Sequence, residues 1–329
     1  MSNTINWGIL ATGAITRKFA TGLKFRDDAK LLAVGSRSQE SADRFGDEFD
    51  VPHRHASYES LAADPDVDVV YIGTPHPMHK ENALLMLEAG KAVLCEKPFT
   101  INAAEAREVV ACARTHGTFL MEAMWSRFIP IMAEVRRLIQ EGAIGDVRMI
   151  TSNTGFRTNF NPDSRLFAPE LGGGALLDVG VYPISFASML LGTPERIVSM
   201  ADLGETGVDE QSAAVLGYSG GQLAAIQTGI RTNTSHESVI MGTDGMIRIH
   251  PPSVAATRLT LHRNDQPTEE IEMPIAGENG YHYQAGEVMD CLRAGETESK
   301  IMPLDETISI METMDMIRGQ WGLKYPSEM

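Results

Sequence analysis

The sequence predicts an α/β protein in which a doubly wound parallel sheet precedes an α+β domain with an open-faced, mostly antiparallel sheet. Over residues 1–123, short apolar runs alternate with helical stretches, a pattern typical of parallel strands joined by helices. After residue 124, strand-like segments follow one another through tight turns. A chain of 329 residues is also long for one ordinary domain. We therefore expect two domains, residues 1–123 and 124–329.

The elements expected in the first domain alternate in type along the chain. Strands are predicted at 5–10, 30–35, 66–72, 92–95 and 119–123, and helices at 17–23, 39–49, 81–89 and 103–115. The second domain should open with a helix at 130–140 and close with helices at 284–294 and 304–318. Its strands are predicted at 146–157, 196–201, 212–218, 223–230, 237–241, 246–250, 258–262 and 270–273. Such a sheet exposes one face, which we expect a homodimer to cover through Val215, Ala225 and Ile240.

Composition argues against several classes of partner. A net charge of −16, with no run of Lys or Arg, argues against binding to nucleic acid or to an anionic membrane surface. Three cysteines without C-x-x-C spacing indicate neither a disulfide framework nor a zinc site. Among nine histidines, His53 and His55 are expected to be solvated in a polar loop, so no metal site is predicted. There is no signal-peptide pattern and no apolar run near the roughly 18 residues of a membrane span, so a cytoplasmic protein is expected.

A glycine turn follows the first predicted strand. Residues 11–16 read Ala-Thr-Gly-Ala-Ile-Thr and lead from that strand into a helix, which is the context of a dinucleotide-binding fingerprint. Gly13 is the residue that would let the backbone approach a pyrophosphate, whereas Ala11 and Thr16 replace the outer two glycines. The alternative is an ordinary strand–helix turn.

The second predicted strand ends in Gly35-Ser36-Arg37-Ser38. An NAD-binding fold normally has a carboxylate here for the ribose 2′-hydroxyl. This chain offers a hydroxyl and a guanidinium instead, which together suit a 2′-phosphate. The pattern favours NADP over NAD, unless Arg37 only caps a solvated loop.

The apolar run 92–95 leads directly into Glu96, Lys97 and Pro98. Charged residues after a buried parallel strand stand at the carboxyl edge of the sheet, where open α/β sheets bind ligands. We therefore interpret Glu96 and Lys97 as ligand-facing, the alternative being a surface ion pair at a strand end.

Three glycines, Gly172–Gly174, precede a candidate acid–base pair. If residues 178–182 are helical, Asp178 and Tyr182 lie on one face, although Pro183 should kink that helix. A carboxylate and a phenol near a lysine form an acid–base set. Spacing alone favours the alternative of a helix start with a buried, hydrogen-bonded tyrosine.

Together these stretches resemble the glucose-fructose oxidoreductase / inositol dehydrogenase (Gfo/Idh/MocA) family over nearly the whole chain. Two further segments, Met121–Phe128 and Thr206–Asp209, and the pair Tyr325-Pro326 resemble its branch of dimeric dihydrodiol dehydrogenases and NADP-dependent D-xylose dehydrogenases. The segments that carry the family resemblance are residues 7–10, residues 71–75, His79, Gly90-Lys91, Cys95–Pro98 and the glycine-rich stretch through Tyr182.

The resemblance implies a Rossmann domain, with Lys97 near the nicotinamide and the reacting hydroxyl, Tyr182 as the acid/base and Asp178 supporting it. It implies cofactor contacts from Thr12, Gly13, Ala14, Ile15, Ser36, Arg37, Thr74, His79, Glu96 and Lys97, and, by likeness to a related reductase branch, from Arg165 and Tyr283. The chain departs from aromatic-diol dehydrogenases at Thr154, at Ser253 and in the shortened stretch Ala276–Gly280, where those enzymes have aromatic pocket walls.

The resulting expectation is an NADP-dependent oxidoreductase that acts on a sugar or polyol hydroxyl carbon, such as C1 of D-xylose, or on a related keto-sugar. Trp125, Arg157, Asn159 and Tyr182 are expected to contact that substrate. One alternative is a trans-dihydrodiol dehydrogenase. An alternative of another class is a non-catalytic sensor that binds a dinucleotide or a sugar on the same fold.

Overall fold

The structure, a computed structural model, describes residues 4–329 and divides into two compact units. The first contains the described residues up to Thr100, together with Ala104–Trp125 and Ala276–Thr307. The second contains Ile101–Ala103, Ser126–Ile275 and Ile308–Met329. The division expected from the sequence has a single boundary, at residue 123, whereas in the structure the chain returns to the first unit at Ala276.

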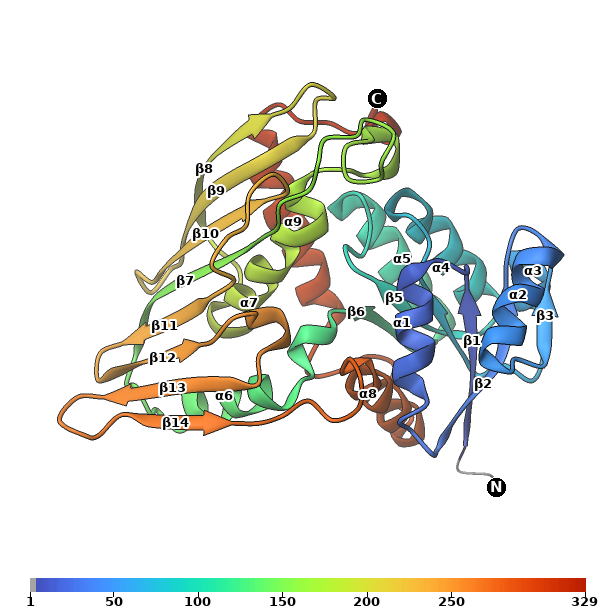
Figure 1. The fold of residues 1–329 in the computed structure, drawn as a ribbon, viewed down its shortest axis with the longest axis horizontal. Coiled ribbons are helices and arrows are strands. Elements are labelled where there is room, and N and C mark those ends of the chain that lie inside the picture. Colours follow the sequence, from blue (N-terminus) through green and yellow to red (C-terminus); the bar gives the residue numbers. More distant parts are fainter. Residues whose placement is uncertain (1–3) are drawn as a thin grey trace. The chain divides into compact units, whose positions relative to one another are not determined.

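The first unit has a six-stranded, fully parallel sheet in the order β3-β2-β1-β4-β5-β6 (Figure 1). The strand order changes direction between β1 and β4, the kind of position at which doubly wound sheets bind ligands beyond their carboxyl ends. The strands are β1 Ile5–Leu10, β2 Ala29–Gly35, β3 His53–His55, β4 Val69–Ile72, β5 Ala92–Glu96 and β6 Leu120–Ala123. The helices are α1 Ala14–Leu23, α2 Gln39–Phe49, α3 Tyr58–Ala62, α4 His79–Glu88, α5 Ala103–His116 and α8 Tyr281–Ala294.

The burial of strands β4 and β5 shows that this sheet is covered on both faces. Every residue of each strand is buried, which is the continuous apolar pattern of a central parallel strand rather than an alternating one. Aromatic rings pack beside them: Phe19 of α1 stacks on Tyr71 of β4 with ring centroids 3.8 Å apart. The predicted parallel α/β fold is therefore confirmed.

The return of the chain at Ala276 is held by polar contacts that the local sequence pattern does not reveal. The side-chain amide of Asn279 donates to the carbonyl of Lys18 at 2.8 Å, and Arg293 of α8 forms an ion pair with Asp28 at 2.8 Å. Helix α8 also packs against α1. Residues far apart in the sequence thus complete the first unit.

The second unit contains an eight-stranded sheet in the order β14-β13-β12-β11-β7-β10-β9-β8 (Figure 1). Its neighbours pair antiparallel except for β7 and β10, which are parallel. The strands are β7 Val147–Gly155, β8 Arg196–Leu203, β9 Asp209–Gly217, β10 Leu223–Gly229, β11 Ser238–Gly242, β12 Gly245–Ile249, β13 Arg258–Arg263 and β14 Glu269–Glu272. The longer helices are α6 Pro130–Gln140, α7 Val181–Leu191 and α9 Leu304–Gly319.

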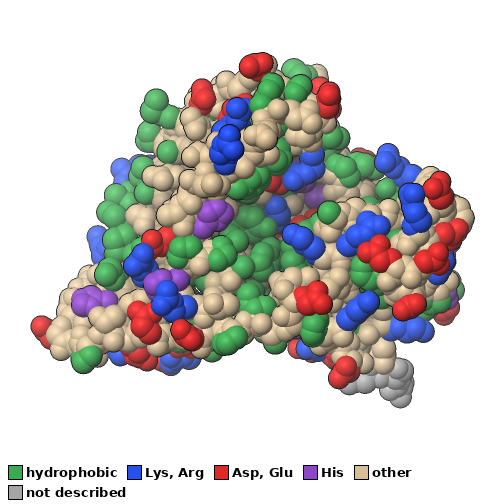
Figure 2. Space-filling view, in the orientation of Figure 1, with side chains coloured by type: hydrophobic (Ala, Val, Ile, Leu, Met, Phe, Trp, Pro, Cys, Tyr) green, Lys and Arg blue, Asp and Glu red, His purple; other side chains and the backbone are tan. Residues whose placement is uncertain are grey.

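One face of this sheet is covered and the other carries exposed apolar side chains. Helix α7 packs on β7 and β10, while Met200 of β8 is 79% exposed and Val215 of β9 is 46% exposed. Figure 2 shows hydrophobic side chains at the left of the view, over β8 to β10. The placement of Ile240 on the open face is wrong: Ile240 is fully buried, because side chains alternate along β11 and its neighbour Val239 has the opposite orientation.

One helical stretch has the length and composition of a membrane span, contrary to the sequence-based expectation. It runs from Pro169 to Leu191, and 72% of its apolar window is buried inside the protein. Such burial is typical of a core helix. On the surface, Figure 2 shows acidic and basic side chains interspersed over the region of α2 and α3 at the right of the view.

Candidate active site

The turn between β1 and α1 has the features of an anion-binding site. Gly13 precedes the first residue of α1, and a Cβ at Gly13 would meet nothing within 4 Å, so the backbone there is open to a ligand. The first N–H groups of a helix lack partners within the helix, and α1 has no acidic residue in its first turn to compete for them. This turn fits the pyrophosphate of a dinucleotide.

The two missing glycines of the fingerprint are replaced by different means. Ala11 adopts a φ of 84°, so it takes the left-handed conformation that glycine would normally supply. Thr16 is fully buried, and a Cβ at Gly73, after β4, would clash with its methyl group at 2.5 Å. The close helix–strand approach is therefore provided by Gly73 instead of by a glycine in α1.

The end of β2 provides a cationic side chain beside a helix start. Ser36 is buried, whereas Arg37 is exposed and forms no hydrogen bond or ion pair with any residue in 4–329. Ser38 caps α2 by accepting the N–H of Ser41 at 3.3 Å. A guanidinium and the positive end of a helix dipole thus lie within a few residues of each other, and each of them favours binding of a phosphate.

At the end of β5, the carboxylate of Glu96 organises the backbone around Lys97. Glu96 is only 4% exposed; its Oε1 accepts the hydroxyl of Tyr71 at 2.5 Å, and its Oε2 accepts the N–H of Lys97 at 3.2 Å. Lys97 itself is half-buried, and the Lys97–Pro98 peptide bond is cis. Glu96 is therefore fixed on two sides and holds the backbone from which the Lys97 side chain extends.

His79 and Thr74 link this segment to the end of β4. The ring of His79 is fully buried, with Nδ1 2.9 Å from the carbonyl oxygen of Pro98 and Nε2 2.9 Å from that of Thr74. Burial is the main cause that lowers the pKa of His79, against the raising effect of these carbonyls. Because its ring has no exposed surface, His79 links two loops by hydrogen bonds and is not open to a cofactor in this structure.

In the second unit, Asp178 and Tyr182 lie at the start of a composite helix. A π-helical turn, Leu176–Gly180, carries Asp178 and is followed by α7, which carries Tyr182. Pro183 is the third residue of α7, directly after the π-helical turn, so the helix accommodates the missing N–H of Pro183 at an irregular turn and continues through it. Asp178 is 7% exposed and forms an ion pair with Arg165, N to O 2.9 Å.

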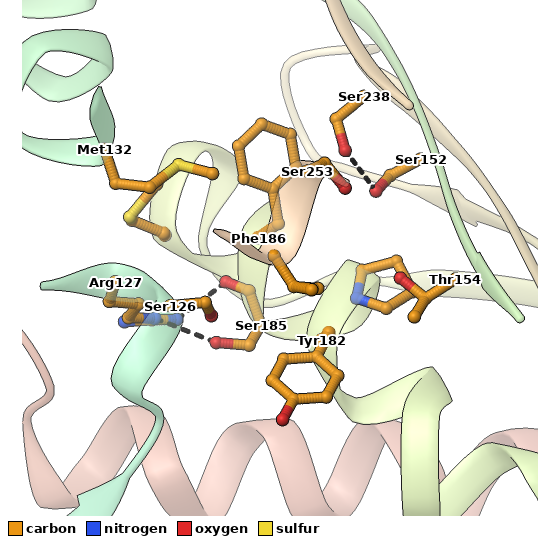
Figure 3. Close-up of a pocket in the computed structure, with 13 residues that line it drawn as sticks. Ser126, Arg127, Met132, Ser152, Thr154, Tyr182, Ser185, Phe186, Ser238 and Ser253 are labelled. Carbon is orange, nitrogen blue, oxygen red and sulfur yellow. Dashed lines mark hydrogen bonds between the residues drawn. The ribbon is translucent and has the colours of Figure 1, made fainter. Parts of the chain in front are cut away.

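A recess with about 340 Å³ of empty space, part of it open to solvent, adjoins the ring of Tyr182 (Figure 3). One side is polar, from Ser152 and Thr154 of β7, and another is apolar, from Met132 of α6 and Phe186 of α7. Figure 3 shows the Tyr182 hydroxyl directed away from Phe186, and Tyr182 is itself one of the residues that line the recess. The remaining lining residues are Ser126, Arg127, Pro183, Ser185, Met189, Ser238, Ser253 and Val254.

Thr154 and Ser253, which lack the aromatic side chains of aromatic-diol dehydrogenases, meet in this recess. Each is 4% exposed. Sequence reasoning missed Arg127 and Ser185, which stabilise the floor of the recess: Arg127 Nε donates to Ser185 Oγ at 2.8 Å. The position of Ser185, three residues after Tyr182 on one helix face, is the only sequence signal that could have suggested it.

Other predicted substrate and cofactor residues lie elsewhere. Arg157 and Asn159 are exposed and do not line the recess. Trp125 is 9% exposed and stacks on Tyr281 with centroids 5.1 Å apart, so at most one face of its indole remains for a ligand. The hydroxyl of Tyr283 accepts the N–H of Ala276 at 3.0 Å and thereby orders the shortened 276–280 stretch.

His53 and His55 are not solvated loop residues as expected. They lie in β3, with His53 Nδ1 2.7 Å and His55 Nε2 2.9 Å from the same oxygen of Asp64. Burial raises the pKa of Asp64, but hydrogen bonds from His53, from the N–H of Asp66 and from His55 bring it below its usual value. Among the described residues these three have a spacing that a metal ion could use, yet both contacts have the length of charge-assisted hydrogen bonds.

Comparison with known proteins identifies the family. Residues 5–124 match the description "Oxidoreductase family, NAD-binding Rossmann fold", and residues 132–248 match "GFO/IDH/MocA C-terminal domain". The chain is 39% identical over 335 residues to trans-1,2-dihydrobenzene-1,2-diol dehydrogenase of Mus musculus, covering 98% of this chain and 99% of the mouse protein. It is 36% identical over 332 residues to the Homo sapiens protein of the same name, with coverage of 98% and 99%.

Solved structures agree with this fold. A 3-ketoreductase from Actinomadura kijaniata in complex with NADP and TDP-benzene superposes with a TM-score of 0.85 at 25% identity, covering 96% of this chain and 97% of that one. An aldose-aldose oxidoreductase from Caulobacter crescentus complexed with glycerol gives a TM-score of 0.89 at 24% identity, with coverage of 97% and 98%. With an NAD(P)-binding Rossmann unit, a strand-end lysine and full-length dehydrogenase relatives, the chain is a dehydrogenase that belongs to the Gfo/Idh/MocA oxidoreductase family.

Proposed function

We propose that the protein is an NADP-dependent dehydrogenase that acts on a hydroxyl-bearing carbon of a sugar or polyol, with an aldose C1 such as that of D-xylose, or a related keto-sugar, as the substrate type. The observation that carries the substrate class is the hydroxyl-lined recess beside Tyr182. The non-catalytic alternative has no support from the full-length relatives, which are named as dehydrogenases.

The preference for NADP rests on the end of β2. Arg37 is exposed and has no partner among residues 4–329, so its guanidinium is available to a 2′-phosphate. Ser36 adds a hydroxyl, and the capped start of α2 adds the positive end of a helix dipole. No carboxylate follows β2 directly to bind the ribose hydroxyls that NAD would present. Measuring kcat/KM for both cofactors tests this preference, and a preference for NAD would contradict it.

The chain's own residues manage the proton. Tyr182 takes the proton of the substrate hydroxyl in the oxidative direction, with assistance from Lys97, and returns it in the reductive direction. Asp178 supports Tyr182 from one turn earlier and is itself neutralised by Arg165, N to O 2.9 Å. Bound NADP would supply the hydride acceptor at C4 of its nicotinamide.

The recess favours a hydroxylated substrate over an aromatic one. Three of its hydroxyls, from Ser126, Thr154 and Ser253, belong to residues at least nine-tenths buried and form no hydrogen bond with the described residues. A substrate hydroxyl would supply the hydrogen-bond partner that these groups lack among the described residues. Sites that pair hydroxyls discriminate strongly against ligands that lack them.

A trans-dihydrodiol remains the second candidate because relatives at 36–39% identity carry that name. The two substrates place different demands on the recess. An aromatic ring gains about 0.5–1.5 kcal/mol from each aromatic partner beyond area burial. Thr154 and Ser253 provide hydroxyls where such partners would stand, so Phe186 is the aromatic side chain that the recess itself offers besides the ring of Tyr182.

The variant Thr154→Val tests this assignment, because it removes the hydroxyl while keeping the shape. We expect kcat/KM for the sugar to fall about tenfold, the scale of an unpaired hydrogen-bonding group, with little change for a trans-dihydrodiol. Thr151→Val, on the opposite face of β7, is the matched control. Equal losses for both substrates would contradict a hydroxyl-specific recess.

A further inference from the structure

Two buried side chains from distant parts of the chain bond the backbone just ahead of Asp178. The carboxylate of Asp209, the first residue of β9, accepts the N–H of Leu176 at 2.7 Å. The hydroxyl of Tyr325, in the C-terminal segment, donates to the carbonyl of Gly173 at 2.8 Å. Asp209 is fully buried and Tyr325 is 1% exposed, so neither can touch a substrate. We call the backbone that they hold, Gly172–Leu176, the glycine segment.

Asp209 acts as a helix cap that comes from another element. Leu176 opens the π-helical turn that carries Asp178, and its N–H is one of the donors that a helix leaves unpaired at its start. A cap normally comes from the residue before the helix, but here Ala175 precedes the turn and has no side-chain acceptor. The Asp209 carboxylate approaches so closely that a Cβ at Gly174, which has a φ of 111°, would collide with its Oδ1. The glycine is therefore needed for this cap.

Tyr325 fixes the other end of the glycine segment and is itself held firmly. Its own N–H donates to Glu328 Oε2 at 2.9 Å, and Glu328 forms an ion pair with Arg318 of α9 at 2.5 Å. Arg318 also pairs with Asp315 at 2.6 Å and lies 5.4 Å from the centre of the Tyr325 ring. The C-terminal segment is thus anchored to α9, so Tyr325 presents its hydroxyl from a rigid support.

The glycine segment also contacts the loop that carries Arg165, the ion-pair partner of Asp178. A Cβ at Gly173 would lie 2.9 Å from the carbonyl oxygen of Arg165 and 2.8 Å from that of Leu166, and the N–H of Gly174 donates to Leu166 at 2.9 Å. The glycine segment is therefore packed directly on the loop that supplies Arg165. Displacing it would move both members of the Arg165–Asp178 ion pair and the start of α7 with Tyr182.

We propose that Asp209 and Tyr325 are positioning residues that fix the glycine segment and thereby orient Asp178 and Tyr182 for proton transfer. This inference rests on the proposed function. Among the contacts described above, the glycine segment is the backbone that connects Asp209 and Tyr325 to Asp178 and Tyr182. A small misplacement of catalytic groups is sufficient to reduce turnover by about 100-fold.

The test is a double-mutant cycle with steady-state kinetics. Asp209→Ala should reduce kcat roughly 10- to 100-fold while the dissociation constant of NADPH, measured by fluorescence, changes less than about twofold. Asp209→Asn, which keeps an acceptor oxygen, should restore most of kcat. In a background of Asp178→Asn, Asp209→Ala should reduce kcat clearly less than it does in the wild type, because the part of its effect that acts through Asp178 is already lost.

Tyr325→Phe should lower kcat about 3- to 10-fold, as expected for loss of one hydrogen bond, and should also be non-additive with Asp178→Asn. The matched control is Tyr218→Phe, since Tyr218 is likewise buried in the second unit but its hydroxyl has no partner among the described residues. Full additivity in either cycle, or an equal loss from Tyr218→Phe, would overturn the inference.

A readout independent of turnover separates this inference from the proposed function. Hydrogen exchange of the amides in 173–182 should become faster in Asp209→Ala than in the wild type, while amides in β4 and β5 are unchanged. If the wild type turned over no sugar, polyol or diol, the proposed function would fail and this exchange difference would still support the positioning role. Unchanged exchange in 173–182 would overturn it whether or not the enzyme is active.

Discussion

Arg37 is the residue on which cofactor preference should depend most directly. Replacing it by alanine removes the guanidinium available to a 2′-phosphate, so Arg37→Ala should raise KM for NADP by about tenfold or more and leave KM for NAD nearly unchanged. Arg44→Ala is the matched control, because Arg44 is an exposed arginine of the neighbouring α2 that pairs with Glu40. Equal effects on the two cofactors would show that Arg37 does not bind the phosphate.

Lys97 should be required for turnover rather than for cofactor binding. Lys97→Met is expected to reduce kcat by ~10²–10⁴, the usual scale for loss of an acid–base participant, with NADPH affinity largely retained. Lys80→Met, at a half-buried lysine that pairs with Glu108, serves as the control. Near-normal turnover in Lys97→Met would remove this residue from the mechanism.

Burial raises the pKa of Asp209 to about 7, against hydrogen bonds that lower it. At pH values between about 4, the ordinary pKa of an Asp side chain, and 7, the folded protein therefore holds a proton that the unfolded chain has released. Stability should accordingly fall as the pH rises through this window and level off above it. Tyr325, the nearby phenol, stays neutral throughout because burial raises its own pKa.

The Asp209→Asn variant has no such proton to release. Its Tm should therefore rise relative to the Tm of the wild type as the pH increases from 5 to 8. Thermal unfolding of the two proteins across this range makes the comparison. Parallel Tm curves would mean that Asp209 does not titrate in this window.

Single residues were predictable from sequence where a strand end carries them. Glu96 and Lys97 follow an apolar run, which is enough to place them at the carboxyl edge of the sheet, where β5 ends in the structure. Ser126 and Ser253 could not be predicted to share a recess, because that depends on which segments meet in space. His79 is a third case: it was predicted to contact the cofactor, whereas in the structure it is completely buried and links two loops.

At the scale of elements, the β1–α1 turn shows how a degraded fingerprint keeps its geometry. Ala11 adopts a φ of 84° that normally favours glycine, so Ala11→Gly should leave stability unchanged or raise it by up to about 1 kcal/mol. Ala111→Gly, in the middle of α5, should lower stability by about 1 kcal/mol through helix propensity alone. Denaturant unfolding compares the two; equal losses would mean that Ala11 is not strained.

Strand and helix positions were largely predictable because hydrophobic periodicity is a local property. Helix 130–140 and strand 5–10, for example, match the structure residue for residue. Pairing is not local: the parallel contact between β7 and β10 joins strands separated by the whole of α7 and two other strands. The orientation error at Ile240 arose for a related reason, since alternation gives two faces but does not say which one is covered.

At the scale of the molecule, the open sheet face should mediate dimerisation, as we propose from its exposed apolar residues. Val198 is 72% exposed and Met200 is 79% exposed, which is unusual for large apolar side chains on a monomer. Light scattering should give a dimer at micromolar concentration for the wild type and a monomer for Met200→Asp. Met316→Asp, at an exposed methionine of α9, should remain a dimer. A monomeric wild type would contradict the proposal.

The measurement that tests the central claim most directly is kcat/KM for D-xylose, D-glucose and trans-dihydrobenzenediol with NADP as the oxidant. Our account predicts that the sugars rank first, because Thr154 and Ser253 give the recess hydroxyl partners in place of aromatic walls. A higher kcat/KM for the aromatic diol would contradict the substrate assignment, although the roles of Lys97, Tyr182 and Arg37 could still hold.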